Sequence, residues 1–167
     1  MPVEIHSLTF NSPVGNLLAQ ASEKGLTKIH FIKTKIFEEH RYTKNQTLIK
    51  ARDQLLEYFE GKRKKFDLPY DFLDASEFYK SVWKILLTIP YGQTLSYGDI
   101  ARKMGDINKS RAIGLANGRN PIAIIIPCHR VIGSNGSLTG YGGGLDIKLQ
   151  LLQLENPGKW VEQVSLF

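Results

Sequence analysis

The pattern of apolar and polar residues predicts a small antiparallel sheet at the start of the chain. Val3 and Ile5 alternate with polar residues, and the pattern then shifts phase to Leu8 and Phe10. Such a shift predicts a strand over residues 3–10 that contains a β-bulge. Two further strands are predicted over residues 17–21 and 26–33, with turns at residues 11–15 and 23–25. Together they form a meander.

Two longer segments have the apolar spacing of helices. The first begins at Thr47 and ends before Gly61, and the second forms a stripe that Pro90 and Gly92 end. The apolar positions are Leu48, Ala51, Leu55, Tyr58 and Phe59 in the first helix, and Phe78, Val82, Ile85, Leu86 and Ile89 in the second. We predict a domain boundary between them, which divides the chain into residues 1–75 and 76–167.

The second domain contains two short predicted helices joined by a tight link. Residues 96–99 read Ser-Tyr-Gly-Asp, a variant of the capping box, and open a helix that runs through Lys103 and ends at Gly105. Residues 106–109 link it to a second helix over residues 110–118. This outline is typical of a helix-turn-helix.

The second of these helices is rich in small residues. It carries Ala112, Gly114, Ala116 and Gly118, with Arg111 near its start. A glycine inside a helix costs about 1 kcal/mol relative to alanine, so a close approach to another backbone should compensate. Tight packing against a neighbouring helix and contact with nucleic acid both satisfy this requirement. The basic residues at the two ends of the helix favour nucleic acid.

Composition limits the class of protein. Hydrophobic residues make up 42% of the 167 residues and charged residues 23%, which excludes collagen-like, coiled-coil and wholly disordered chains. The longest aliphatic run, residues 122–126, is far shorter than the roughly 20 apolar residues of a membrane-spanning helix. The first residues also lack the pattern of an export signal. The sequence therefore predicts a cytoplasmic protein without a membrane partner.

The net charge of +6 is concentrated in one part of the chain. The segment from residue 80 to residue 130 carries all of the excess, because Lys80, Lys84, Arg102, Lys103, Lys109, Arg111, Arg119 and Arg130 face only Asp99 and Asp106. A polyanion would therefore be attracted to this region.

The sequence contains a single cysteine, Cys128, and 4 histidines. One cysteine cannot form an intramolecular disulfide or supply a thiolate-rich zinc site, so no metal is predicted. Cys128 is then either a buried structural thiol or a nucleophile. His129 and Arg130 follow it directly, and positive charge beside a thiol is expected to lower its pKa. These neighbours favour the nucleophile.

The residues around Cys128 resemble the O6-alkylguanine-DNA alkyltransferase family. The motif Ile-Pro-Cys-His-Arg-Val at residues 126–131 is preceded by Asn120-Pro121 and followed by Tyr-Gly-Gly-Gly at residues 141–144. The resemblance extends over residues 78–158. The first 75 residues match only in their layout, which is similar to the family's ribonuclease-H-like domain. The implied fold is α+β, with a winged-helix-like, mostly helical second domain that contains the helix-turn-helix.

The resemblance implies DNA repair by direct alkyl transfer. Family members bind duplex DNA in the minor groove, rotate the damaged base out of the stack and move its alkyl group to the cysteine. Arg111 would fill the gap in the duplex, or else contact a phosphate. The residues implied at the DNA surface are Arg111, Ala112, Gly114, Ala116, Gly118 and Arg119. The resemblance leaves O4-alkylthymine open as a second substrate.

It also implies a role for each residue of the site. Cys128 is the nucleophile, a water links it to His129, and Glu155 orients the imidazole. Asn120 braces the cysteine loop. Around the base, the implied contacts are Tyr97 to the purine ring, Tyr141 and the N–H of Gly142 to O6, and the carbonyls of Cys128 and Val131 to the exocyclic amine. Many relatives have serine at the position of Gly142.

A thioether has no leaving group activated for hydrolysis, so each molecule should react once, as a monomer and without a cofactor. Two other interpretations remain. One is a sensor that binds alkylated DNA without reacting, although relatives of that kind replace the cysteine. The other is a Cys-His hydrolase, which would turn over acyl substrates and have no use for the basic helix pair.

Overall fold

The computed structural model describes residues 2–36 and 38–160. The chain forms two compact units, one of Met1–Asp74 with Pro121–Ile125 and the other of Ala75–Asn120 with Ile126–Phe167. No feature of the hydrophobic pattern predicted that residues 121–125 join the first unit. Within the described residues, no helix has both the length and the apolar character needed to span a bilayer.

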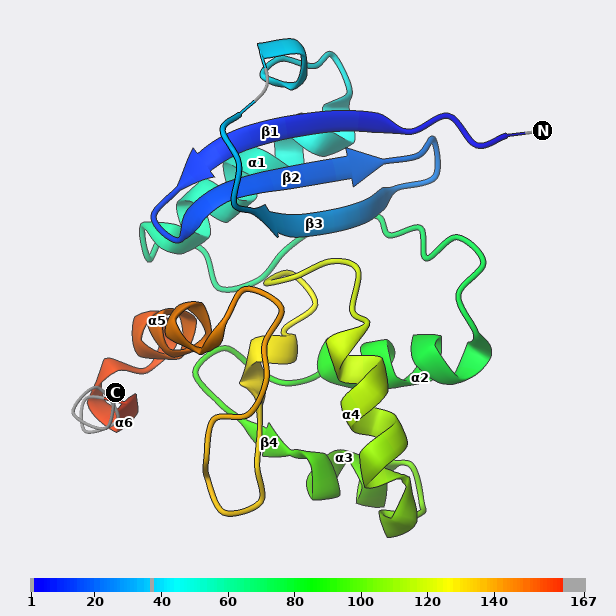
Figure 1. The fold of residues 1–167 in the computed structure, drawn as a ribbon, viewed down its shortest axis with the longest axis vertical. Helices are drawn as coiled ribbons and strands as arrows, with labels where there is room; N and C mark the ends of the chain where they lie inside the picture. The colour runs from blue at the N-terminus through cyan, green and yellow to red at the C-terminus, as the bar shows by residue number, and fades with distance from the viewer. Residues whose placement is uncertain (1, 37, 161–167) are drawn as a thin grey trace. The chain divides into compact units, whose positions relative to one another are not determined.

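The first unit contains a three-stranded antiparallel sheet in the order β1 (His6–Ser12), β2 (Gly15–Ala21), β3 (Leu26–Ile32), drawn in blue in Figure 1. The predicted bulge in the first strand is wrong, because β1 pairs with β2 in unbroken register from His6 to Ser12. Val3 and Ile5 precede the strand and are exposed. The register irregularity lies instead at Gln20/Ala21, where β2 pairs with β3.

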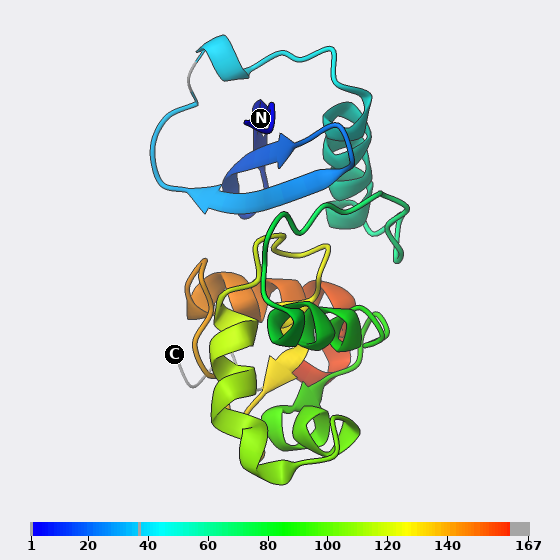
Figure 2. The same cartoon turned by 90° about the vertical axis from the view of Figure 1, so that its right-hand side faces the viewer.

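Helix α1 (Gln46–Phe59) lies against one face of this sheet, as Figure 2 shows. Asn45 caps it by accepting a hydrogen bond from the N–H of Leu48. The apolar positions predicted for its inner face, Leu48, Ala51, Leu55 and Tyr58, are all fully buried. On β1, Oγ1 of Thr9 donates to the carbonyl of His40, in the short 3-10 helix η1 (Glu38–His40). The predicted sheet and helix are thus confirmed.

Two short segments cover the outer edge of β3. The N–H of Leu26 donates to the carbonyl of Pro69 (2.8 Å), and the N–H of Ile29 donates to the carbonyl of Pro121 (3.0 Å). Gly25 permits the first approach, since a Cβ atom there would lie 2.6 Å from the Pro69 carbonyl oxygen. The second contact ties residues 121–125 to the sheet, so this edge is not left open to other chains.

The second unit is mostly helical (Figures 1 and 2). Its elements are α2 (Glu77–Leu86), β4 (Leu95–Ser96), α3 (Tyr97–Lys103), η2 (Ile107–Lys109), α4 (Ser110–Gly118), η3 (Cys128–Arg130), β5 (Val131–Ile132), α5 (Leu145–Glu155) and α6 (Pro157–Trp160). The short strands β4 and β5 pair in parallel. Ser96 and Asp99 form the predicted capping box at the start of α3.

Helices α3 and α4, joined through η2, form the predicted helix-turn-helix. Helix α4 packs on α2 through Ile113 and Ala116, which are both fully buried. The indole N–H of Trp83 donates to the carbonyl of Ala116 at 2.9 Å and fixes the two helices to one another. The remaining side of α4 is therefore left facing outward.

Candidate active site

The chain enters the site through a tight turn directly before Cys128. The N–H of Cys128 donates to the carbonyl of Ile126 at 2.7 Å, across Pro127. Nδ2 of Asn120 donates to the same carbonyl at 2.8 Å, and Nδ2 of Asn117 lies 3.5 Å from the carbonyl oxygen of Cys128. Two amides from the end of α4 therefore hold the turn that presents the thiol.

Cys128 is 6% exposed, and burial raises the pKa of its thiol. A hydrogen bond from the side chain of Asn120 and the positive charge of Lys148 act in the opposite direction. This corrects the expectation that His129 and Arg130 lower the thiol pKa. Neither acts as a free cation beside the sulfur, because both side chains point to one carboxylate.

That carboxylate belongs to Glu155, at the end of α5. His129 is completely buried, and its Nε2 lies 2.7 Å from Oε2 of Glu155. The other ring nitrogen, Nδ1, is buried without a hydrogen-bond partner among the described residues. Burial lowers the pKa of His129, although Glu155 acts against this shift. The structure thus brings His129 and Glu155 together as the resemblance implied.

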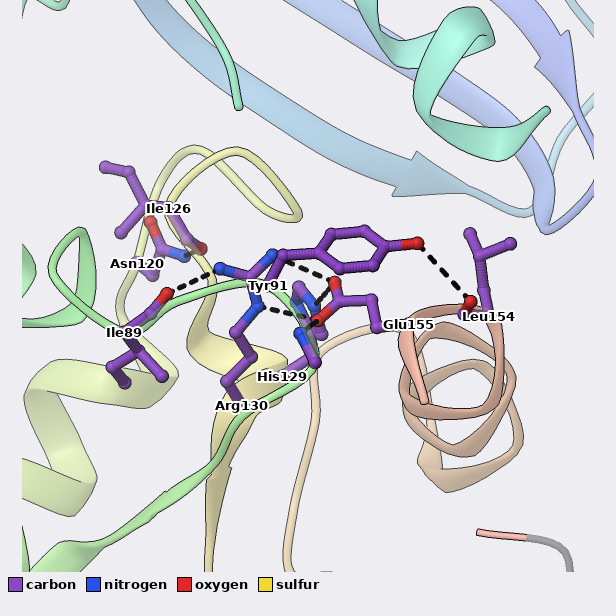
Figure 3. A network of polar contacts seen from close by, with 9 residues as sticks. Ile89, Tyr91, Asn120, Ile126, His129, Arg130, Leu154 and Glu155 are labelled. Atoms are coloured by element: carbon purple, nitrogen blue, oxygen red, sulfur yellow. Dashed lines mark hydrogen bonds and ion pairs between the residues drawn. The ribbon is translucent and has the colours of Figure 1, made fainter. Parts of the chain in front are cut away.

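Arg130 is the second partner of Glu155, and sequence analysis missed this role. Its Nε donates to Oε1 at 2.7 Å and its Nη2 to Oε2 at 3.0 Å, while Nη1 donates to the carbonyl of Ile89 at 2.6 Å (Figure 3). Arg130 is 6% exposed. It therefore does not belong to the basic surface in which its charge was counted. Burial would raise the pKa of Glu155, but hydrogen bonds and charge from His129 and Arg130 outweigh it and hold that pKa well below its usual value.

Lys148 is a further buried charge that the prediction missed. Its Nζ donates to the carbonyls of Val131 and Thr139, both at 2.7 Å. Burial lowers its pKa to about 8. Its position carries a usable signal, since Lys148 and Glu155 lie at the two ends of the apolar stripe that contains Leu151 and Leu152. Polar residues that continue the buried face of a helix are candidates for a site.

The remaining residues predicted to contact the base lie near these groups in different ways. Tyr97, at the start of α3, has its hydroxyl 3.0 Å from Oγ1 of Thr139. The hydroxyl of Tyr141 is buried, and burial raises its pKa well above the ordinary value. Gly142 is exposed, with no atom within 4 Å of a Cβ built on it, so a serine would fit there. The carbonyl of Val131 already accepts from Lys148.

The outer face of α4 is made of small and basic residues. Arg111, Ala112, Gly118 and Arg119 are exposed, and no atom lies within 4 Å of a Cβ built on Gly118. Ala116 corrects the prediction, because its side chain is fully buried against α2 and cannot reach DNA from the outer face. Gly114 is half-buried beside the ring of Tyr97.

Comparison with known proteins identifies the family. Residues 77–157 match the family model described as 6-O-methylguanine DNA methyltransferase, DNA binding domain, and residues 5–72 match the ribonuclease-like domain of the same family. The chain belongs to the 6-O-methylguanine DNA methyltransferase family. The predicted family and fold class are thereby confirmed.

Individual family members match over nearly their full lengths. The methylated-DNA--protein-cysteine methyltransferase of Methanosarcina acetivorans is 50% identical over 149 residues, which cover 87% of this chain and 95% of that protein. The crystal structure of Mycobacterium tuberculosis O6-methylguanine methyltransferase superposes with a TM-score of 0.80 at 46% identity, covering 92% of this chain and 94% of that one. Mycobacterium tuberculosis OGT in complex with DNA gives a TM-score of 0.79 at 47% identity, with 91% and 93% covered.

Proposed function

We propose that this protein repairs duplex DNA by moving the alkyl group from O6 of guanine to Sγ of its own Cys128, once per molecule. The observation that carries the proposal is the state of His129. Because Nε2 faces the Glu155 carboxylate at 2.7 Å, it holds the ring proton and donates it. The buried Nδ1 atom is then an unprotonated acceptor beside the only thiol of the chain.

The proposed reaction is an in-line displacement at the alkyl carbon. The bond from Sγ of Cys128 to that carbon forms as its bond to O6 of guanine breaks, and the bonding electron pair stays with the purine. The thiol proton passes to Nδ1 of His129, through a water as the resemblance implies, and Glu155 stabilises the resulting imidazolium. The departing purine takes up a proton, so the products are an S-alkylated protein and an intact guanine.

A buried thiol with a raised pKa suits this scheme. Cys128 remains protonated and inert until the base at Nδ1 receives its proton, and the charge of Lys148 then favours the thiolate. We propose that Tyr97 assists the leaving purine by hydrogen bonding to its ring, with Tyr141 and the N–H of Gly142 at O6. The Cys128 and Val131 carbonyls would hold the exocyclic amine.

We propose that the outer face of α4 contacts the minor groove. That groove is only about 6 Å wide, so a helix reaches its floor where the side chains are small, as at Ala112 and Gly118. Arg111 would enter the duplex beside the flipped base, and Arg119 would contact phosphate. A free catalytic thiol needs a reducing compartment, which supports a cytoplasmic location.

A duplex oligonucleotide that bears O6-methylguanine tests the proposal. The intact mass should rise by one CH2 per molecule, on the peptide that contains Cys128, and stop at one equivalent. Cys128→Ser should still bind the duplex without any change in mass. Tight binding by the wild-type protein with no change in mass would support the non-reactive sensor instead. Repeated turnover of an acyl ester would support the hydrolase.

A further inference from the structure

We propose that Arg130 is a positioning residue that keeps the Glu155 carboxylate paired, so that His129 stays neutral and its Nδ1 remains free to accept the Cys128 proton. This inference rests on the proposed function. It assigns a fourth member to the group of Cys128, His129 and Glu155, one that contacts neither the substrate nor the sulfur.

The first step of the argument is the geometry around the carboxylate. Both oxygens of Glu155 are occupied by Arg130 at 2.7 and 3.0 Å, and His129 shares Oε2 at 2.7 Å. The backbone N–H of Gly92 also donates to Oε1 at 3.2 Å. A two-pronged guanidinium matches a carboxylate better than an imidazole does, so Arg130 is the principal counter-ion.

The second step concerns what His129 would do without that counter-ion. A buried carboxylate demands a compensating positive charge, and the imidazole is the next group within reach. His129 would then bind a second proton at Nδ1 and form an ion pair with Glu155. In that state Nδ1 carries a proton and cannot accept another from Cys128. The permanent charge of Arg130 removes this demand.

Other charged groups near His129 act in the same direction or weakly. Burial lowers the pKa of His129, and the charges of Arg130 and Lys148 lower it further, whereas Glu155 raises it. The neutral groups that face this cluster are Cys128, on the same turn, and Tyr91 and Tyr141, which titrate well above neutral pH. Arg130 is thus the cation whose removal changes the balance at Glu155.

The third step is the anchoring of Arg130 itself. Nη1 donates to the carbonyl of Ile89 at 2.6 Å, and the guanidinium carbon lies 5.8 Å from the centre of the Tyr91 ring. The hydroxyl of Tyr91 in turn donates to the carbonyl of Leu154, next to Glu155 (Figure 3). The turn after α2 therefore fixes both the arginine and the end of α5 that carries its partner.

The test compares the wild-type protein with Arg130→Met and Arg130→Lys. The rate of methyl transfer to Cys128 is measured under excess methylated duplex across pH, and the titration of His129 is followed by NMR on protein with 15N-labelled histidine. In Arg130→Met we expect the His129 inflection to move up by one pH unit or more, with transfer near neutral pH slowed by about tenfold and partly restored at higher pH. Arg130→Lys should restore most of the shift, since it keeps the charge.

Arg41→Met provides the matched control, because Arg41 pairs with Glu38 at 3.0 Å in the first unit, at an exposed site. It should leave both curves unchanged. If Arg130→Met slows transfer equally at every pH and leaves the His129 inflection in place, the residue is only structural and the inference is wrong.

A second variant keeps the test decisive if Arg130→Met does not fold. Arg130→Met with Glu155→Gln removes both buried charges, and its His129 inflection should return to the low wild-type range. An inflection that stays high would overturn the inference. The NMR titration does not depend on methyl transfer, so failure of the proposed function and failure of this inference are separate results.

Discussion

The Nζ atom of Lys148 donates a hydrogen bond to the carbonyl of Val131 at 2.7 Å, and a second one to the carbonyl of Thr139 at the same distance. Val131 directly follows the Cys128 turn, and Thr139 holds the hydroxyl of Tyr97. One buried side chain of α5 therefore fixes both the strand after the thiol and the loop that leads to Tyr141. Both segments supply proposed contacts to the base.

Lys148→Met should change how stability depends on pH. Burial lowers the folded-state pKa of Lys148 from 10.5 to about 8, so between these values the unfolded chain binds more protons than the folded one. The free energy of unfolding of the wild-type protein should gain a contribution from Lys148 as pH rises through this window. Lys148→Met should lose that contribution, as measured by urea unfolding at several pH values.

Lys84→Met is the control, because Lys84 is exposed on α2 and its loss removes the same formal charge. It should keep the wild-type slope. The interpretation of Lys148 as a buried, partly neutralised amine would be refuted if the two variants gave equal slopes.

Asn120→Ala should make the thiol less reactive. The amide of Asn120 donates to the Ile126 carbonyl at 2.8 Å and also lowers the Cys128 pKa by hydrogen bonding. Its loss leaves a buried carbonyl unpaired, which costs about 1–3 kcal/mol of stability, and raises the thiol pKa further. The rate of iodoacetamide labelling of Cys128 against pH measures the shift.

Asn16→Ala removes a comparable amide-to-carbonyl bond, 3.0 Å from the carbonyl of Thr34, at an exposed position of the first unit. Labelling of Cys128 should be unaffected in this control. An unchanged thiol pKa in Asn120→Ala would mean that Asn120 only shapes the turn.

Gly118→Leu should weaken DNA binding without unfolding the protein. No atom lies within 4 Å of a Cβ at this position, and the backbone of Gly118 has no positive φ that would oppose a side chain. The bulk would lie on the outer face of α4 and hold the helix away from a narrow groove. We expect an affinity loss of about tenfold or more, or at least about 1.4 kcal/mol, measured by fluorescence anisotropy on a duplex.

Gly158→Leu is a matched control on α6, where a Cβ would also meet no atom within 4 Å. It should preserve both the melting temperature and the affinity. Equal losses in the two variants would show that α4 is not the binding face.

Arg111→Ala and Arg119→Ala should each reduce the salt dependence of binding. Both side chains are exposed at the ends of α4. Each phosphate contact that is lost should lower the slope of log affinity against log salt concentration by about 0.9. Lys33→Ala removes an exposed charge from the first unit and should leave the slope as it is. A slope that stays constant in Arg111→Ala would favour its insertion into the duplex without a phosphate contact.

Local chemistry made much of this fold predictable. Helix α4 spans Ser110–Gly118 as expected, and the Ser96–Asp99 capping box is present, because caps and apolar periodicity act within a few residues. The strand start was wrong for a related reason. Val3 and Ile5 alternate as strand residues do, yet nothing pairs with them, and pairing is decided by the partner strand.

The site was less predictable wherever a role depends on a distant partner. Arg130 reads as a surface cation until Glu155, which lies 25 residues later, is placed against it. Ala116 reads as one of a set of small outward residues until Trp83 and α2 cover it. Charge and size are visible in a sequence, but the direction in which a side chain points is set by long-range packing.

Acid should destabilise the protein in two steps, both set by the buried pair of His129 and Glu155. The folded-state pKa of His129 lies below its ordinary 6.5, so as pH falls below 6.5 the unfolded chain gains a proton that the folded chain refuses. The folded-state pKa of Glu155 lies below its ordinary 4.5, so a second loss begins as pH falls through that value. In both windows the unfolded state binds more protons, and stability therefore falls with pH. Urea unfolding from neutral to acidic pH should show this decline, and Glu155→Gln should flatten its lower part. A wild-type stability that stayed constant below 6.5 would mean that His129 is already protonated in the fold, and the base assigned to Cys128 would be lost with it.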